Sequence, residues 1–171
     1  MSSGSSTSED LWERSRTRWR RCEPNIGLTW GRDLTGDNFV SKVASYKGYG
    51  WKKTVLEIGP GYGRLLRTCL ERKVPFKKYV GIDISERNVK YLKENFPFEN
   101  IRIIHGDIES FAFDTKFDVV QSSLTFKHLY PTFENALRNV AKYASRKCMF
   151  FFDLIEGDKQ YFEPEDNVTY I

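Results

Sequence analysis

Acidic and glycine residues follow three apolar runs of the sequence, at positions where they could bind a ligand. The first run ends in a loop with alternating glycines, Glu57-Ile58-Gly59-Pro60-Gly61-Tyr62-Gly63. Such glycines permit a tight turn and let the backbone approach a ligand closely. Asp83 ends the second run, 20 residues beyond Gly63, which is the spacing at which an acid reaches ribose hydroxyls. After the third run, Asp107 can accept from the exocyclic amine of adenine while Ile108 lies against the ring.

The glycine loop departs from the fingerprint of dinucleotide-binding proteins. That fingerprint, G-x-G-x-x-G, would place its third glycine at position 64, where this chain has Arg64 and instead carries Gly63. Glu57 lies inside an otherwise apolar run, and a carboxylate is costly to bury without hydrogen-bond donors. A ligand or a loop with amine and amide donors would supply them, whereas a pyrophosphate would be repelled. A nicotinamide-dependent oxidoreductase is therefore disfavoured.

These residues need secondary-structure elements that bring them to one edge of a sheet. Apolar runs predict strands at 54–58, 78–84, 101–105, 117–122 and 148–155, and helical periodicity predicts helices at 64–72, 85–95 and 131–144. A further helix is expected over about 35–47, capped by Thr35 or Asp37. Alternating strands and helices predict a doubly wound, Rossmann-like α/β sheet that is mostly parallel. Its ligand would lie beyond the carboxyl ends of the strands.

The motifs gain specificity from their order along the chain. Glu57 and the three glycines precede Asp83, then Gly106-Asp107-Ile108, then Phe117-Asp118-Val119-Val120 running into Ser122-Ser123. In this order, over roughly residues 50–157, the sequence resembles a class I S-adenosylmethionine-dependent methyltransferase. The resemblance implies S-adenosyl-L-methionine as cofactor and S-adenosyl-L-homocysteine as product. The residues it implies for cofactor binding are Glu57, Gly59, Gly61 and Gly63 around the methionine part, Asp83 and Ile84 at the ribose, Asp107 and Ile108 at the adenine, and Ser122 and Ser123 near the transferred methyl group.

Few residues near the expected mouth of the site could act on an acceptor. His128 follows the fourth predicted strand and is the candidate general base, because an unperturbed imidazole titrates near neutral pH. The alternative is that His128 is a structural residue that orients the loop into the 131–144 helix. Tyr130 could line the acceptor pocket, and Trp30 could cover the methyl donor, stack on an acceptor or simply pack a helix onto the sheet.

Missing motifs narrow the acceptor class. Enzymes that methylate exocyclic amines of bases typically carry an (Asn/Asp/Ser)-Pro-Pro-(Tyr/Phe) run where this chain has Ser122-Ser123-Leu124-Thr125, and no cysteine stands there as a nucleophile. No cluster of acids or of cysteine and histidine suggests a metal. We therefore expect methyl transfer to oxygen or nitrogen of a small molecule. The alternatives are an RNA or protein methyltransferase docking through its Arg-rich N-terminus, and a non-catalytic cofactor-binding module.

Composition sets wider bounds. The 171 residues carry a net charge of only +4, which argues against a dedicated nucleic-acid partner. The longest apolar run, Cys148–Phe152, is far too short to cross a membrane. The three scattered cysteines are typical of reduced thiols in a cytoplasmic protein.

The chain divides into three expected parts. Residues 1–22 form a flexible segment with five arginines, residues 23–50 a cap helix region, and residues 51–171 the methyltransferase core. The resemblance implies seven strands, the last two a hairpin, whereas five are predicted here. Either the chain is a fragment or short form, or its sheet is completed differently.

Overall fold

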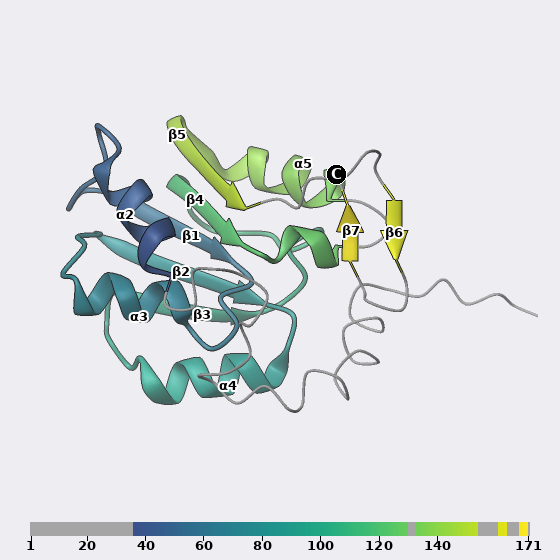
Figure 1. Ribbon diagram of the computed structural model, residues 1–171, viewed down its shortest axis with the longest axis horizontal. Helices are drawn as coiled ribbons and strands as arrows, with labels where there is room; N and C mark the ends of the chain where they lie inside the picture. Colours follow the sequence, from purple (N-terminus) through teal and green to yellow (C-terminus); the bar gives the residue numbers. More distant parts are fainter. Residues whose placement is uncertain (1–35, 130–132, 154–160, 164–167, 171) are drawn as a thin grey trace, which may run out of the picture.

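The computed structural model describes residues 36–129, 133–153, 161–163 and 168–170 (Figure 1). Its main sheet has five parallel strands in the order β3-β2-β1-β4-β5. The chain therefore moves outward from β1 to β3 and then returns to the other side of β1, which places the switch point between β1 and β4. The predicted Rossmann-like sheet is confirmed. The strands are β1 (Thr54–Ile58), β2 (Lys78–Asp83), β3 (Ile101–His105), β4 (Phe117–Ser123) and β5 (Ala144–Asp153).

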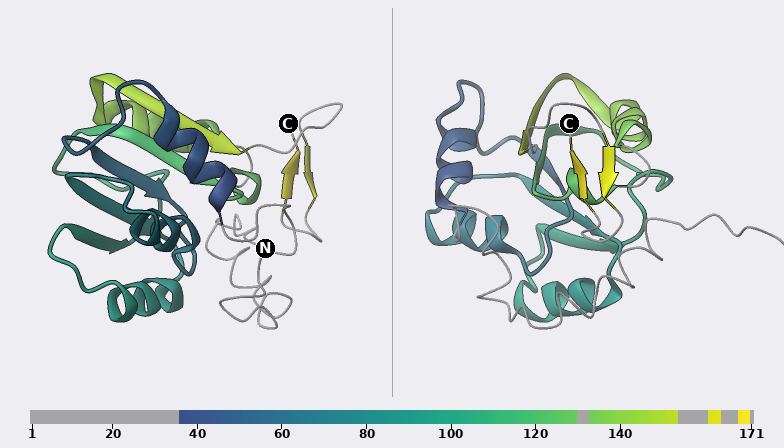
Figure 2. Two further views of the ribbon diagram at one scale, coloured as in Figure 1. Left: turned by 60° about the vertical axis from the view of Figure 1, so that its left-hand side comes forward. Right: turned by 45° about the vertical axis from the view of Figure 1, so that its right-hand side comes forward.

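Helices cover both faces of this sheet, as the apolar character of the strands requires. On one face, α2 (Asp37–Ser45), α3 (Arg64–Glu71) and α4 (Glu86–Asn95) pack with alternate strand residues into one buried cluster. On the other face, α5 (Glu134–Tyr143) and the short 3₁₀ helix η1 (Phe126–His128) share a second cluster with the remaining strand residues. Figure 2 shows α2 and α5 on different sides of the molecule.

Two sequence-based predictions about element ends are wrong. Neither Thr35 nor Asp37 caps α2: its N-cap is Gly36, in a left-handed conformation with φ 82° and without a side-chain cap. A Cβ at Gly36 would come within 2.7 Å of Leu65 Cδ2, so glycine lets this turn approach α3. The last strand begins at Ala144, directly after α5, rather than at Cys148. The other predicted ends agree within three residues, and Ser85 is the N-cap of α4.

A separate pair of short strands lies near the C-terminal end. β6 (Tyr161–Glu163) and β7 (Val168–Tyr170) are antiparallel and form a sheet of their own, with β7 beside η1 (Figure 1). Residues 154–160 and 164–167 lie outside the described residues, so the missing strand hairpin stays a prediction. The proposed domain boundaries also stay predictions, since residues 1–35 fall outside the description.

Candidate functional site

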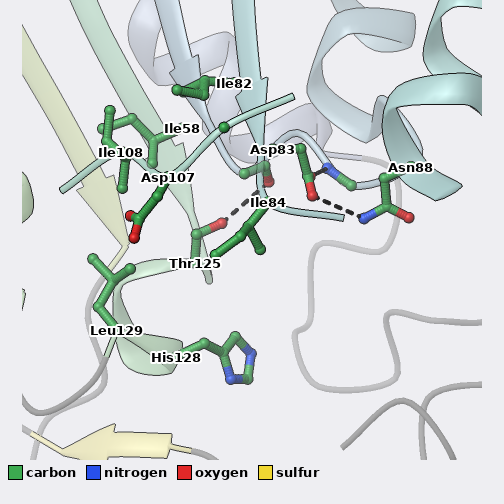
Figure 3. Close-up of a pocket in the computed structure, with 13 residues that line it drawn as sticks. Ile58, Ile82, Asp83, Ile84, Asn88, Asp107, Ile108, Thr125, His128 and Leu129 are labelled. Atoms are coloured by element: carbon green, nitrogen blue, oxygen red, sulfur yellow. Dashed lines mark hydrogen bonds between the residues drawn. The ribbon is translucent and has the colours of Figure 1, made fainter. Parts of the chain in front are cut away.

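A pocket opens at the carboxyl ends of β1, β2, β3 and β4, where the fold predicts a ligand. Its empty space is about 620 Å³, a figure that includes solvent at the open mouth. Apolar and acidic side chains share the lining: Ile58, Ile82, Asp83, Ile84, Asn88, Asp107, Ile108, Thr125, His128 and Leu129, together with Gly59, Gly61 and Gly106 (Figure 3).

The glycine loop meets the chain that follows β4. Gly59 has φ 64°, and a Cβ there would lie 2.2 Å from Thr125 Oγ1. The Thr125 hydroxyl donates to the Gly59 carbonyl over 3.1 Å, so the two segments are held together across the switch point. Gly61 has φ 57° but open space around it, and Gly63 is the N-cap of α3. The loop therefore needs glycine at residue 59 for two separate reasons, backbone conformation and space.

Glu57 lies under this loop and is almost fully buried, with 2% of its surface exposed. Its Oε2 accepts from the Tyr79 hydroxyl at 2.8 Å and from Gln121 Nε2 at 2.9 Å. Burial raises the pKa of Glu57 from its ordinary 4.5 to about 7, against the two hydrogen bonds and the charge of Arg64, which lower it. The donors shown for Glu57 thus come from β2 and β4 of the protein itself, and Glu57 is not among the residues that line the pocket.

Asp83 ends β2 and links three segments around the pocket. Its Oδ2 accepts from the Gly61 amide at 2.9 Å, while Oδ1 accepts from the Ser85 amide at 2.9 Å and Asn88 Nδ2 at 3.2 Å. Burial raises its pKa to about 6 despite these bonds. Asp83 and the neighbouring Ile84 both line the pocket, which is where ribose-binding residues were expected (Figure 3). Asp83 does not cap α4, because Ser85 has that position.

The residues expected at the adenine follow β3 on the same pocket wall. Asp107 Oδ1 accepts from the Glu109 amide at 2.9 Å, which shapes the turn and leaves the carboxylate among the lining residues. Ile108 is buried and also lines the pocket. Asn139 of α5 fixes this loop from behind by donating to the carbonyls of Ile108 and Phe111, at 2.8 and 2.9 Å.

The two serines that end β4 are not among the residues that line the pocket. Ser122 is fully buried and donates its hydroxyl to the Ile58 carbonyl at 2.9 Å, a bond that joins β4 to β1. Ser123 Oγ accepts from Arg64 Nη2 at 2.5 Å. Next along the chain, Leu124 has a left-handed backbone with φ 66°, an unusual conformation for a bulky residue. This turn brings Thr125 into the lining in place of the serines.

Of the three residues predicted to act on or bind the acceptor, one lies at the pocket and two lie outside the described residues. His128 of η1 is half-buried and lines the pocket, away from the two carboxylates (Figure 3). Trp30 and Tyr130 lie outside the described residues. Sequence reasoning overlooked Asn88, Thr125 and Leu129. Asn88 carried a signal, because it stands at the third position after the α4 N-cap and close to Asp83. Thr125 carried a weaker one, as a small hydroxyl residue just beyond the end of β4.

Replacing Glu57 with glutamine should change how stability depends on pH. Because the pKa of Glu57 is raised on folding, the native state holds its proton more tightly, and stability falls as pH rises from about 4.5 to about 7. The raised pKa of Asp83 also makes stability fall as pH rises, but this effect ends near pH 6. We therefore expect melting temperatures of the Glu57→Gln variant to be flat above pH 6, while those of the parent protein still fall. Parallel curves would contradict a buried, protonating Glu57.

The part of the chain that the structure describes contains neither a group of metal-ligating side chains nor a membrane-spanning helix. There, no three histidine, cysteine or acidic side chains are grouped so that they could hold a metal ion. No helix within the described ranges combines the length and the apolar character needed to cross a bilayer. The cytoplasmic location stays a prediction.

Comparison with known proteins identifies the family. Residues 55–146 match the family described as Methyltransferase domain. The ribosomal RNA small subunit methyltransferase A of Mycoplasma capricolum is 31% identical over 80 residues, which cover 46% of this chain and 29% of that protein. The phthiotriol/phenolphthiotriol dimycocerosates methyltransferase of Mycobacterium tuberculosis is 29% identical over 106 residues, which cover 61% of this chain and 38% of that protein. The chain thus spans about a third of the length of these curated relatives.

Solved structures agree on the fold. The glycopeptide N-methyltransferase MtfA superposes with a TM-score of 0.62 at 18% identity, covering 72% of this chain and 55% of that one. An S-adenosylmethionine-dependent methyltransferase from Clostridium acetobutylicum superposes with a TM-score of 0.63 at 15% identity, and the superposition covers 86% of this chain and 65% of that one. The family match spans more than half of the sequence and contains the glycine loop, Asp83, Asp107 and Ser123. The chain therefore belongs to the methyltransferase domain family.

Proposed function

We propose that this chain binds S-adenosyl-L-methionine and transfers its methyl group to oxygen or nitrogen of a small-molecule acceptor. One observation carries the proposal: the pocket presents its polar groups in the order of the parts of that cofactor. Asp107 and Ile108 follow β3 at the adenine end, Asp83 follows β2 at the ribose, and the glycine loop follows β1. Structural neighbours complexed with S-adenosylmethionine and S-adenosylhomocysteine support the same reading.

The described residues fit this cofactor by their chemistry. Asp83 is a buried carboxylate that can accept from two ribose hydroxyls, and the aliphatic Ile108 offers a face to the adenine ring. When bound, the cofactor supplies a methyl group on a positively charged sulfur, which leaves as a neutral thioether. The protein's task is then alignment, since holding the acceptor in line with the reacting bond provides much of the rate. A base is needed only where the acceptor must lose a proton.

Calorimetric titration of the purified chain tests cofactor binding directly. We expect micromolar binding of S-adenosylmethionine and S-adenosylhomocysteine. NAD is the negative control, because Arg64 replaces the third glycine of the dinucleotide-binding fingerprint and the Glu57 carboxylate would repel a pyrophosphate. The absence of binding by a folded protein, judged by a cooperative thermal transition, would overturn the proposal. Binding without methyl transfer to any tested acceptor would instead favour a non-catalytic module.

The acceptor class rests on less direct support. The pocket lies at the carboxyl ends of the strands, where parallel α/β folds bind small ligands. The Ser122-Ser123-Leu124-Thr125 segment lacks the run typical of enzymes that methylate exocyclic amines of bases. RNA is the second candidate, because several curated relatives are named ribosomal RNA methyltransferases. Salt dependence separates the two, since contacts to phosphates make binding fall steeply with salt. A shallow slope for the preferred acceptor supports the small molecule, and a steep one supports RNA.

We expect His128→Ala to separate catalysis from cofactor binding. His128 lines the pocket from η1, whereas the cofactor-binding carboxylates follow β2 and β3. The variant should keep its affinity for S-adenosylhomocysteine within about twofold, and methyl transfer should slow by about 100-fold if His128 takes the acceptor's proton. Initial rates at saturating cofactor over pH 6–9 measure this, because the acidic limb of the parent profile should vanish. A large loss of cofactor affinity would mean that His128 contacts the cofactor instead.

A further inference from the structure

We infer that the end of the sheet opposite the pocket binds single-stranded nucleic acid. This inference goes beyond the proposed function and does not depend on it. The surface, termed the amino-end face, consists of the loop between α2 and β1 and of the residues at the starts of β1, β2, β4 and β5, from which the strand arrows point away in Figure 1. Its members are aromatic or basic: Tyr46 and Trp51, with Lys47, Lys52, Lys53, Lys77, Lys78, Lys116, Arg146 and Lys147.

Parallel pairing places the basic residues in a row. Because the five strands are parallel, their amino ends share one edge of the sheet. The carbonyl of Lys53 accepts from the amide of Lys77 at 2.8 Å, which holds the start of β1 beside that of β2. Lys116 comes directly before β4, and its ammonium donates to the carbonyl of Lys142 in the last turn of α5. Neighbouring strands lie roughly 4.8 Å apart, so the cations recur along a line, as phosphates do along a nucleic-acid strand.

The edge strand β5 adds two more cations to this row. Arg146 and Lys147 are exposed and lie where the pairing of β5 with β4 shifts register, between Phe117 and Val119. An irregularity of this kind bends a strand and re-aims its side chains. The basic row therefore reaches from the start of β2 to the edge of the sheet.

The acids at this end do not neutralise the row. Asp118 of β4 is held by the Thr54 amide and the Ser145 hydroxyl, each at 3.0 Å, and Asp114 pairs with Arg102 at 2.9 Å. Other acids of this end lie in the last turns of α3 and α4 and before β3: Glu71, Glu94 and Glu99. Within the described ranges, the ion pairs join residues outside the amino-end face. The net charge of +4 for the whole chain thus conceals a strongly basic surface.

Exposed aromatic side chains lie among these cations. Trp51 is 74% exposed and Tyr46 is 56% exposed, and Lys47 and Lys52 stand next to them in the same loop. The ring of Tyr46 meets that of Phe151 edge-on, with centroids 5.5 Å apart, so the loop lies against β5. Surfaces that bind single strands combine these two features, since lysines contact the phosphates and aromatic rings stack on the bases.

The combination favours a single strand over other polyanions. A duplex offers phosphates but keeps its bases stacked inside, so it leaves Trp51 without a partner. An anionic membrane attracts lysines but has no line of phosphates to match the row. The pocket lies at the other end of β1, whose 5 residues span roughly 16 Å, so the amino-end face is a separate site.

Fluorescence anisotropy with a labelled oligouridylate of about 12 nucleotides, a length within the range of known single-strand sites, tests the role of the cations. We expect Lys52→Gln combined with Lys147→Gln to weaken binding about 10-fold at low salt. The slope of log affinity against log salt should become shallower by about 1.4, because each phosphate contact of a single strand contributes about 0.7. Lys90→Gln combined with Lys93→Gln removes the same charge from the exposed side of α4 and should change affinity less than about twofold.

Trp51 separates stacking from charge. We expect Trp51→Ala to weaken binding of the oligouridylate about 10-fold without changing the salt slope, and to leave binding of an abasic oligomer unchanged. Trp51→Phe keeps a smaller ring and should retain part of the affinity, and it replaces the alanine variant if that variant lacks a cooperative thermal transition. An oligothymidylate of the same length distinguishes the sources, because the tighter of the two oligomers identifies RNA or DNA.

Several results would overturn the inference. A folded parent protein that does not bind the oligouridylate at low salt would do so. Equal losses in the amino-end and α4 variants would assign binding to net charge alone. Full affinity in the Trp51 variants would exclude a stacked single strand. Vesicles of phosphatidylserine that bind more tightly than the oligomer, and that lose affinity in the same variants, would assign the face to a membrane.

Titration with S-adenosylhomocysteine keeps this inference apart from the proposed function. The amino-end variants should bind that ligand as tightly as the parent protein, because the pocket lies at the opposite end of the sheet. A parent protein that binds the oligouridylate but not S-adenosylhomocysteine would overturn the proposed function and support this inference.

Discussion

Replacing Asp83 with alanine is expected to weaken binding of S-adenosylhomocysteine by about 100-fold. The change removes the buried carboxylate that lines the pocket after β2 and leaves two ribose hydroxyls without a charged acceptor. Each hydrogen bond to a charged group contributes roughly 1.5–3 kcal/mol, so the loss of even one would be measurable. The variant also frees the Gly61 amide, which now donates to Asp83 Oδ2 over 2.9 Å. Calorimetric titration at pH 8, where Asp83 is ionised, measures the effect.

Two further variants separate the ligand effect from damage to the fold. Asp114→Ala removes an exposed carboxylate that pairs with Arg102 at 2.9 Å, and it should leave cofactor affinity unchanged. Asp83→Asn keeps the size of the side chain and one acceptor oxygen, so it should bind with intermediate affinity. An Asp83→Ala variant that folds and binds as tightly as the parent protein would disprove the ribose assignment.

Replacing Gly59 with alanine is expected to destabilise the protein and abolish cofactor binding. The new Cβ would lie 2.2 Å from Thr125 Oγ1 and 2.4 Å from Thr125 Cγ2, at a residue whose φ is 64°. Overpacking costs typically about 1–3 kcal/mol, and a left-handed backbone adds about 1–2 kcal/mol for a residue with a Cβ. Relief would require the loop to move away from the end of β4, which would open the pocket wall. Thermal unfolding and calorimetry measure both effects.

A second glycine of the same loop provides the matched control. Gly61 has nearly the same backbone, with φ 57°, but nothing lies within 4 Å of its missing Cβ. Gly61→Ala should therefore show the backbone cost alone and be the more stable of the two variants. Adding Thr125→Gly to Gly59→Ala removes the clash and should recover stability beyond additivity. Equal destabilisation by the two alanine substitutions would show that the contact with Thr125 does not matter.

The carboxylates that line the pocket could be predicted because their positions depend on local sequence. An acidic residue stands at or just after the end of an apolar run, as Asp83 does for β2 and Asp107 for β3. Parallel strands bring those ends to one edge of the sheet. Asp83, Asp107 and Ile108 therefore line one pocket, as predicted. Glu57 could be predicted in the same way, because a lone acid in an apolar strand requires partners.

The partners themselves could not be predicted, because they depend on strand register. Glu57 lies opposite Gln121 in the pairing of β1 with β4, and Gln121 is 64 residues away in the chain. Likewise, Asn139 is 31 residues from the Ile108 carbonyl that it supports. No local pattern of these residues indicates such a contact, since the packing of distant segments creates it.

The end of β4 shows most plainly what the sequence predicts and what the tertiary structure decides. The run of Ser122, Ser123, Leu124 and Thr125 is recognisable as a strand end from sequence, and small polar residues there predict a ligand. Which of them faces the pocket depends on side-chain alternation and on the left-handed turn at Leu124. That geometry buries Ser122 against Ile58, gives Ser123 to Arg64 and brings Thr125 to the lining. Sequence alone therefore determined the fold class, the glycine loop and the acids of the site. The strand pairing and the packing of the turns selected their partners, because those contacts join residues that are distant in the chain.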